Sequence, residues 1–102
     1  MPALAILAAT GQNFRHILGL SHAANGRGIE VHIFMTGRGV RHALEPDFQQ
    51  LLDVARVSFC RVSLVDQGID PDNDLPGVDP RNITNQSRHA DLLDLCDRYL
   101  VL

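Results

Sequence analysis

The chain has 102 residues, of which 45% are hydrophobic and 21% are charged, and its formal net charge is −3 at pH 7. This length predicts one domain spanning residues 1–102, and the composition is that of an ordinary soluble globular protein. All 9 basic residues are arginines, scattered along the chain instead of forming a basic stripe. We therefore expect no nucleic-acid partner. The lack of lysine excludes Schiff-base and P-loop lysine mechanisms.

The two cysteines, Cys60 and Cys96, are too few for a disulfide framework, and the chain has no CxxC motif. The apolar opening at residues 1–9 has no basic region before it, because the first charged side chain is Arg15. A buried strand explains this segment better than a signal peptide does. No stretch approaches the roughly 20 apolar residues of a membrane span. We therefore expect a cytoplasmic protein with free thiols and no membrane partner.

The first third of the chain predicts two strands with a helix between them. Residues 3–9 form a continuous apolar run, which is typical of a strand covered on both faces. A break at residues 10–12 precedes a predicted helix over residues 13–25, whose apolar side chains recur on one face. Residues 29–35 place an apolar side chain at every second position and predict the second strand.

The middle of the chain predicts a helix and a third strand. Residues 36–39 form a glycine-rich turn, and residues 40–44 are expected to make a short helical turn. Pro46 suits the start of a helix. Apolar residues follow it at the i, i+3, i+4 and i+7 spacing of one helical face, ending at Ala55. Residues 57–60 predict a short strand.

The last third of the chain combines a loop with a helix and a closing strand. Residues 63–67 predict one helical turn, and residues 70–81 are rich in Pro, Asp, Asn and Gly and predict a loop. A helix is expected over residues 85–95, with Thr84 as its candidate cap. Residues 99–102 predict the closing strand.

Strands and helices therefore alternate along the chain. This order is typical of βαβ units, which place parallel strands in one sheet with helices over both faces. The expected fold class is α/β, a single-domain three-layer sandwich with a mainly parallel sheet.

Ligands of open parallel sheets bind beyond the carboxyl ends of the strands. Three segments follow predicted strands in this chain and are the candidates for a site. They contribute the candidate catalytic residue Cys60 and the binding candidates Thr10, Gly11, Gln12, Thr36, Gly37 and Arg61.

Cys60 carries the most chemical information of these residues. It lies between a predicted strand and a helical turn, where the partial positive charge of a helix N-terminus favours the thiolate. Arg61 adds a formal positive charge beside it. A thiolate attacks sulfur and carries a persulfide, which makes Cys60 the candidate catalytic residue. The alternative is a packing role, because free cysteine is among the most buried residue types.

Cys96 and His42 are the other two side chains that could take part in chemistry. Cys96 precedes the closing strand and is expected near the opposite edge of the sheet, about 15 Å from Cys60 given the rise of a strand. A disulfide requires Cα atoms within about 7 Å, so we interpret Cys96 as a packing residue. His42 is a candidate to assist Cys60, although an ordinary surface histidine is the favoured interpretation.

No cofactor or metal motif is complete. The turn at residues 37–39 lacks the third glycine of a dinucleotide fingerprint, because His42 stands in its place. The acidic segment that begins at Asp70 is not a calcium loop, because Leu75 replaces the required glycine and Arg81 the required glutamate. We therefore expect no cofactor and no metal site.

Two local motifs and the order of the segments resemble the DsrE family, which includes the sulfur-relay subunits called Tus and Dsr. The first motif is Phe59 to Ile69 (FCRVSLVDQGI). It is similar to the family's apolar strand, cysteine and short helix, followed by a glycine and an aliphatic residue. The second, Cys96 to Leu102 (CDRYLVL), resembles the closing strand. The segment from Ile33 to Val40 (IFMTGRGV) resembles the second strand and its turn.

The resemblance spans nearly the whole chain and implies an α/β fold, a cytoplasmic setting and a homo-oligomer, often a trimer or hexamer. It also implies a sulfur carrier or sulfurtransferase, in which Cys60 accepts persulfide sulfur from a donor protein and passes it to an acceptor protein. The chain departs from the family at Gln67, where arginine is usual, and has no second cysteine near Cys60. The alternative function is a non-catalytic small-ligand-binding or assembly subunit of the same fold.

Overall fold

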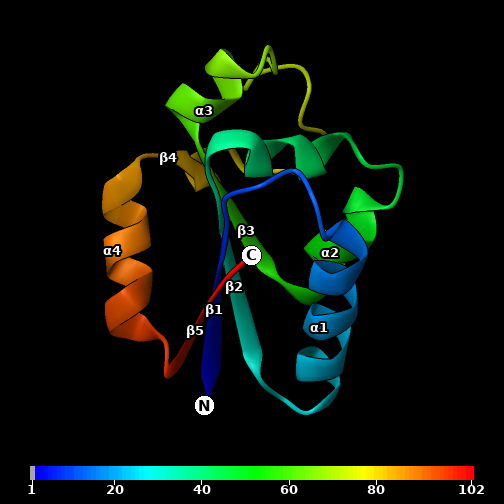
Figure 1. Ribbon diagram of the computed structural model, residues 1–102, viewed down its shortest axis with the longest axis vertical. Coiled ribbons are helices and arrows are strands. Elements are labelled where there is room, and N and C mark those ends of the chain that lie inside the picture. Colours follow the sequence, from blue (N-terminus) through cyan, green and yellow to red (C-terminus); the bar gives the residue numbers. More distant parts are fainter. Residues whose placement is uncertain (1) are drawn as a thin grey trace.

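Five parallel strands form the central sheet of the protein (Figure 1). The computed structural model describes residues 2–102, apart from the side chains at positions 86, 88 and 89. The strand order across the sheet is β4-β3-β2-β1-β5. The strands are β1 (Ala3–Ala8), β2 (Glu30–Met35), β3 (Arg56–Cys60), β4 (Ile83–Thr84) and β5 (Arg98–Val101).

Helical segments connect these strands. The α-helices are α1 (Phe14–Gly26), α2 (Phe48–Val54), α3 (Arg61–Asp66) and α4 (Gln86–Leu95). The two 3₁₀ segments are η1 (Gly37–Leu44) and η2 (Pro80–Asn82).

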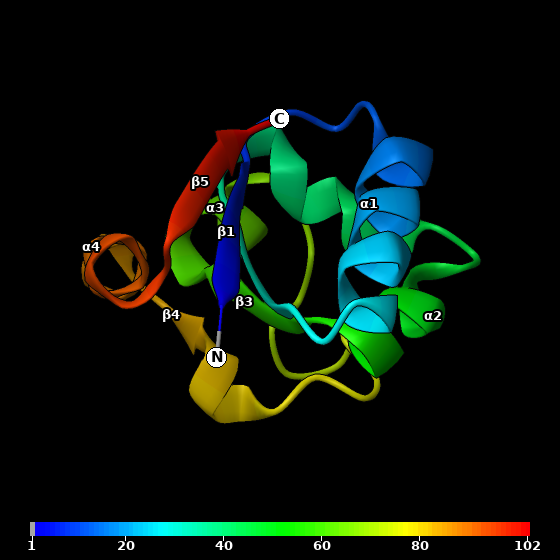
Figure 2. The same cartoon turned by 90° about the horizontal axis from the view of Figure 1, so that it is seen from below.

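The helices cover both faces of the sheet, which confirms the expected α/β sandwich. Figure 2 shows α1 and α2 on one face and α4 on the other. The chain adds β2, β3 and β4 in turn on one side of β1, then crosses back to place β5 on the other side. Right-handed crossovers that run in opposite directions put their helices on opposite faces of a sheet. In Figure 1, α3 and η1 lie beyond the carboxyl ends of the strands.

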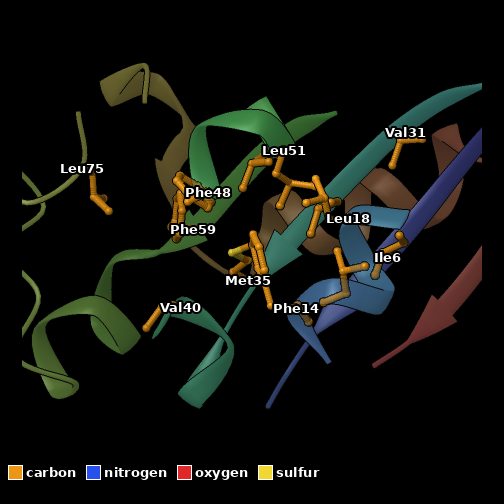
Figure 3. Close-up of a cluster of buried hydrophobic side chains, with 14 of the residues drawn as sticks. Ile6, Phe14, Leu18, Val31, Met35, Val40, Phe48, Leu51, Phe59 and Leu75 are labelled. Carbon is orange, nitrogen blue, oxygen red and sulfur yellow. The ribbon is translucent and has the colours of Figure 1, made fainter. Parts of the chain in front are cut away.

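The larger apolar cluster lies between the sheet and the helices α1 and α2 (Figure 3). Every second residue of the central strands points into it, because side chains alternate across a sheet. Phe59 of β3 is fully buried in this cluster, and its ring centroid lies 6.0 Å from that of Phe48 on α2. This face therefore supplies most of the hydrophobic core.

The face of the sheet that α4 covers has a smaller apolar cluster. Two buried polar side chains, His32 of β2 and Ser58 of β3, also lie on this face. Each is two residues before a member of the cluster, Phe34 or Cys60, and therefore points to the same side of the sheet. The cluster itself consists of Ala5, Phe34, Cys60 and Leu92, with Leu7 and Cys96 partly buried against it.

Three details of the predicted elements are wrong. Helical structure begins at Gly37, where a turn was expected. The strand β4 was not predicted, because two residues are too few to show a periodic pattern. The cap of α4 is Asn85, whose Oδ1 accepts a hydrogen bond from the Ser87 N–H at 3.0 Å. Thr84 instead pairs with Cys60 in the sheet.

Candidate active site

Cys60 lies at the boundary between a strand and a helix, as the sequence predicted. It is the last residue of β3 and the N-cap residue of α3. Its side chain belongs to the smaller apolar cluster with Phe34 and Leu92, and 6% of the residue is exposed. The thiol is therefore largely covered, at the carboxyl edge of the sheet.

Two hydroxyl side chains from different elements meet beside this thiol. Ser63 Oγ on α3 accepts a hydrogen bond from the Gly37 N–H at 2.8 Å, and Thr36 Oγ1 lies 3.4 Å from Ser63 Oγ. A backbone N–H only donates, so the hydroxyl proton of Ser63 remains available for another acceptor. The turn after β2 is thereby tied to α3 next to Cys60, and it holds the Ser63 hydroxyl in place.

These groups lower the pKa of the Cys60 thiol from its ordinary value. Burial is the largest single influence and raises this pKa, because it disfavours the charged thiolate. Polar contacts with the side chain and N–H of Ser63, the N–H of Val62 and the Thr36 hydroxyl together outweigh burial. The two N–H groups act electrostatically, since no side-chain cap hydrogen bond of normal geometry forms. The charge of Arg61, invoked from the sequence, is not among the causes, and its side chain is exposed.

The structure brings part of the predicted binding set to Cys60. Thr36 and Gly37 meet α3 there because β2 and β3 are neighbours in the sheet. The binding candidates from the turn after β1 are exposed and lie one strand further away from β3; they are Thr10, Gly11 and Gln12.

The backbone of η1 occupies the space beyond the end of β1. A Cβ at Gly39 would lie 1.9 Å from the carbonyl oxygen of Ala8, so only glycine permits this approach. A Cβ at Gly11 would lie 3.4 Å from the carbonyl oxygen of Arg38. The turn after β1 therefore faces η1, whereas the turn after β2 faces the thiol.

Ser63 is the site residue that the sequence analysis did not identify. Its signal in the sequence is a hydroxyl three positions after Cys60, at the third residue of the following helix. In that position, the helix geometry points the backbone N–H back toward the N-cap side chain. The pairing of Ser63 with the Gly37 N–H depends on strand order, which a local pattern does not contain.

His42 is not a surface residue, contrary to the favoured interpretation of the sequence. It is 1% exposed, and its ring centroid lies 5.7 Å from that of Phe14 on α1. Burial lowers the pKa of His42, while the Thr10 backbone and the Glu45 carboxylate oppose this shift. Neither ring nitrogen makes a hydrogen bond. The side chain therefore packs η1 against α1.

Cys96 follows α4 as its C-cap residue, and both cysteines are free thiols. Burial, followed by the nearby carboxylates of Asp97 and Glu30, raises the pKa of Cys96. It packs against the smaller apolar cluster. The structure thus confirms that Cys60 and Cys96 form no disulfide and that Cys96 has a packing role.

No protein-family model matches the chain, and no curated protein matches it. Within residues 2–102, no helix has both the length and the apolar character needed to cross a membrane. Among the side chains that the structure describes, no three metal-ligating groups gather. What the site offers chemically is a thiol with a lowered pKa, held beside two hydroxyls, which suits nucleophilic attack on sulfur.

Proposed function

We propose that the protein is a cytoplasmic sulfur carrier of the DsrE type, which holds sulfur as a persulfide on Cys60. The observation that carries this proposal is the position of the Cys60 thiol at the junction of β3 and α3, where contacts with Ser63 and Thr36 help to lower its pKa. A lower pKa supplies more thiolate near neutral pH, and the thiolate is the reactive form of cysteine. The resemblance of the sequence motifs to the DsrE family supports sulfur as the group transferred.

The proposed transfer has two steps. The Cys60 thiolate attacks the outer sulfur of a donor persulfide, the donor S–S bond breaks, and the donor leaves as a thiolate. A thiolate of the acceptor then attacks the outer sulfur of the Cys60 persulfide, and Cys60 leaves as a thiolate. No external oxidant or reductant is required, because each step exchanges one sulfur–sulfur bond for another.

The contacts of Ser63 and Thr36 favour both steps of this transfer. They stabilise the thiolate that attacks the donor and the same thiolate when it leaves toward the acceptor. Thiol exchange depends on the pKa of both the attacking and the leaving thiol, and a leaving thiol of lower pKa departs faster. A carrier that must release its sulfur therefore gains from a lowered pKa at Cys60.

Donor and acceptor are proposed to be proteins. Cys96 lies beyond the other end of α4, so no second thiol of the chain is placed beside Cys60. Two apolar side chains on α3 are exposed next to the thiol, Val62 at 77% and Val65 at 64%. Such side chains provide a contact surface for a protein that brings its own cysteine to the rim of the sheet.

We also propose a homo-oligomer, a trimer or hexamer as the family resemblance implies. The edge strand β5 supports this proposal, because three apolar residues along it are exposed: Tyr99 at 39%, Leu100 at 40% and Val101 at 59%. An exposed apolar edge strand favours association with another chain. Sedimentation velocity tests the proposed oligomer. Leu100→Arg should shift the protein toward monomer, and a wild-type protein that sediments as a monomer would contradict the proposal.

Mass spectrometry of the intact protein tests the carrier function. After native protein is incubated with inorganic polysulfide and desalted, we expect a gain of the mass of one sulfur atom that dithiothreitol reverses. Cys60→Ser should abolish the gain, and Cys96→Ser is the matched control that should retain it. The proposal fails if the native protein gains no sulfur, or if Cys60→Ser gains as much as the wild type.

The alternative is a non-catalytic small-ligand-binding or assembly subunit, and the 6% exposure of Cys60 favours it. Timed labelling with iodoacetamide separates the two functions, with Cys96→Ser as background so that only Cys60 reacts. A carrier should label in the folded state faster than the protein unfolds. Labelling limited by the unfolding rate would support the non-catalytic subunit.

A further inference from the structure

A cavity of about 490 Å³ opens at the outer edge of β3, at the end of the strand away from Cys60, and both α2 and α4 contribute to its lining. It exists because β4 pairs with only the last two residues of β3, which leaves the outer edge of the strand before Phe59 without a strand neighbour. Helix α4 and the segment leading into η2 form the other walls. The polar residues that line the cavity are His32, Arg56, Ser58, Asp79, Asn82 and Asp91.

Two buried polar side chains line this cavity, His32 and Ser58. His32 is 7% exposed, and its Nε2 faces Glu30 Oε1 at 2.9 Å. Ser58, on the neighbouring strand, is 8% exposed, and its hydroxyl bonds to no described residue. Buried polar groups in native proteins normally have partners. The Ser58 hydroxyl is therefore available to a ligand.

Among the described side chains around the cavity, one carboxylate has no cationic partner. Arg81 holds Asp79 with Nε and Nη2, and this pairing lowers the pKa of Asp79 to about 2. Arg56 contacts Glu30, with 3.3 Å between Nε and Oε1. Asp91 on α4 forms no ion pair with any described side chain, so its carboxylate is the group of this lining that would attract a cation.

Apolar side chains line the same cavity. Leu92 is 5% exposed and Leu95 is 63% exposed, and both line the cavity from α4. A ligand that matches this lining needs a cationic group for Asp91, a hydroxyl for Ser58 and a short hydrocarbon chain that contacts the leucines.

We propose that this cavity binds a small amino alcohol, an organic cation whose ammonium and hydroxyl groups are a few carbons apart. The ammonium pairs with Asp91, and the hydroxyl bonds with the Ser58 hydroxyl. The volume lies within the range of small-molecule pockets, which runs from about 300 to 1,000 Å³. The site is separate from Cys60, which does not line the cavity.

Three probes that differ only at their charged end test this proposal. These are 4-amino-1-butanol, the neutral 1,4-butanediol and the anion 4-hydroxybutyrate, each titrated into the full protein and followed by amide NMR spectra. We expect saturable shifts at Ser58 and Leu92 with the amino alcohol, weaker binding of the diol and none of the anion. The proposal is overturned if no probe gives saturable shifts there, or if the three bind equally.

Matched variants on α4 locate the binding. Asp91→Asn should weaken amino-alcohol binding roughly fivefold, close to the level of the diol. Asp94→Asn removes the same charge from the same helix outside the cavity and should leave binding unchanged. Equal losses in both variants would show a general charge effect and overturn the site. Cys60→Ser should bind as the wild type does, so the cavity and the sulfur carrier can fail independently.

Discussion

The two faces of the sheet are used in different ways. The α1 and α2 face buries 18 apolar residues in one cluster among the described residues, whereas the α4 face buries four. The α4 face also holds the thiol of Cys60 and the buried polar groups His32 and Ser58. One face therefore provides most of the stability, and the other holds the candidate nucleophile and the buried polar side chains.

This difference follows from the topology. Two consecutive crossovers place α1 and α2 on one face, and a single return crossover places α4 on the other. A sheet face covered by one helix buries less apolar surface, and hydrophobic stabilisation is roughly proportional to that area. Polar and reactive side chains are thus tolerated on the α4 face at a smaller loss of packing.

The largest expected effect compares equivalent leucines on the two faces. Leu51 on α2 is 0% exposed in the large cluster, and Leu92 on α4 is 5% exposed in the small one. Leu51→Ala should lower the free energy of unfolding by about 3 to 5 kcal/mol, because it opens a sealed cavity. Leu92→Ala should cost about 2 kcal/mol, because Leu92 already borders an open cavity. Urea unfolding measures both, and an equal or larger cost at Leu92 would contradict the proposed difference between the faces.

A smaller effect is expected when the support of Cys60 is removed. Ser63→Ala deletes the hydroxyl that contacts the thiol and leaves the Gly37 N–H unpaired. The pKa of Cys60 should rise, and alkylation at neutral pH should slow several-fold as the thiolate fraction falls. The lost hydrogen bond should cost about 1 kcal/mol of stability. The pH dependence of the iodoacetamide rate, in a Cys96→Ser background, measures the shift.

Ser58→Ala is the matched control for this substitution. It removes a hydroxyl from the same strand as Cys60, two residues earlier, where the side chain faces the cavity instead of the thiol. The alkylation profile of Cys60 should stay unchanged in this variant. If both variants slow the reaction equally, the lowered pKa does not originate from Ser63.

The sequence contained most of the fold because its elements carry strong local signals. The apolar run of β1, the alternating pattern of β2 and the helical spacing that begins at Phe48 predict elements that the structure confirms. Strand β4 was missed because two residues directly after a Pro- and Asp-rich segment show no pattern. Its pairing with β3 depends on contacts between residues distant in the sequence.

The candidate site was only partly predictable for the same reason. The position of Cys60 follows from local patterns, and so does the helix that begins after it. The approach of Gly37 to Ser63 requires β2 and β3 to be neighbours. His42 shows the opposite error, because its polar side chain predicts a surface position although its ring is buried against Phe14 of α1.

The smallest expected effect compares the two cysteines at opposite ends of the α4 face. The folded protein lowers the pKa of Cys60 and raises that of Cys96. Above the lowered pKa of Cys60 and up to about 8.5, the value of an unfolded thiol, the unfolded chain holds more protons at Cys60, so stability rises with pH. Above that value the folded protein holds more protons at Cys96, so stability falls.

Cys60→Ser should therefore remove the rise of the unfolding free energy with pH, and Cys96→Ser should remove its fall at higher pH. Urea unfolding under reducing conditions, between about pH 7 and pH 10, measures both slopes. If Cys60→Ser leaves the rise intact, its thiol has the same pKa in the folded and unfolded chains. The hydroxyls of Ser63 and Thr36 would then exert no net effect on the sulfur, and the α4 face would hold a buried cysteine instead of a nucleophile.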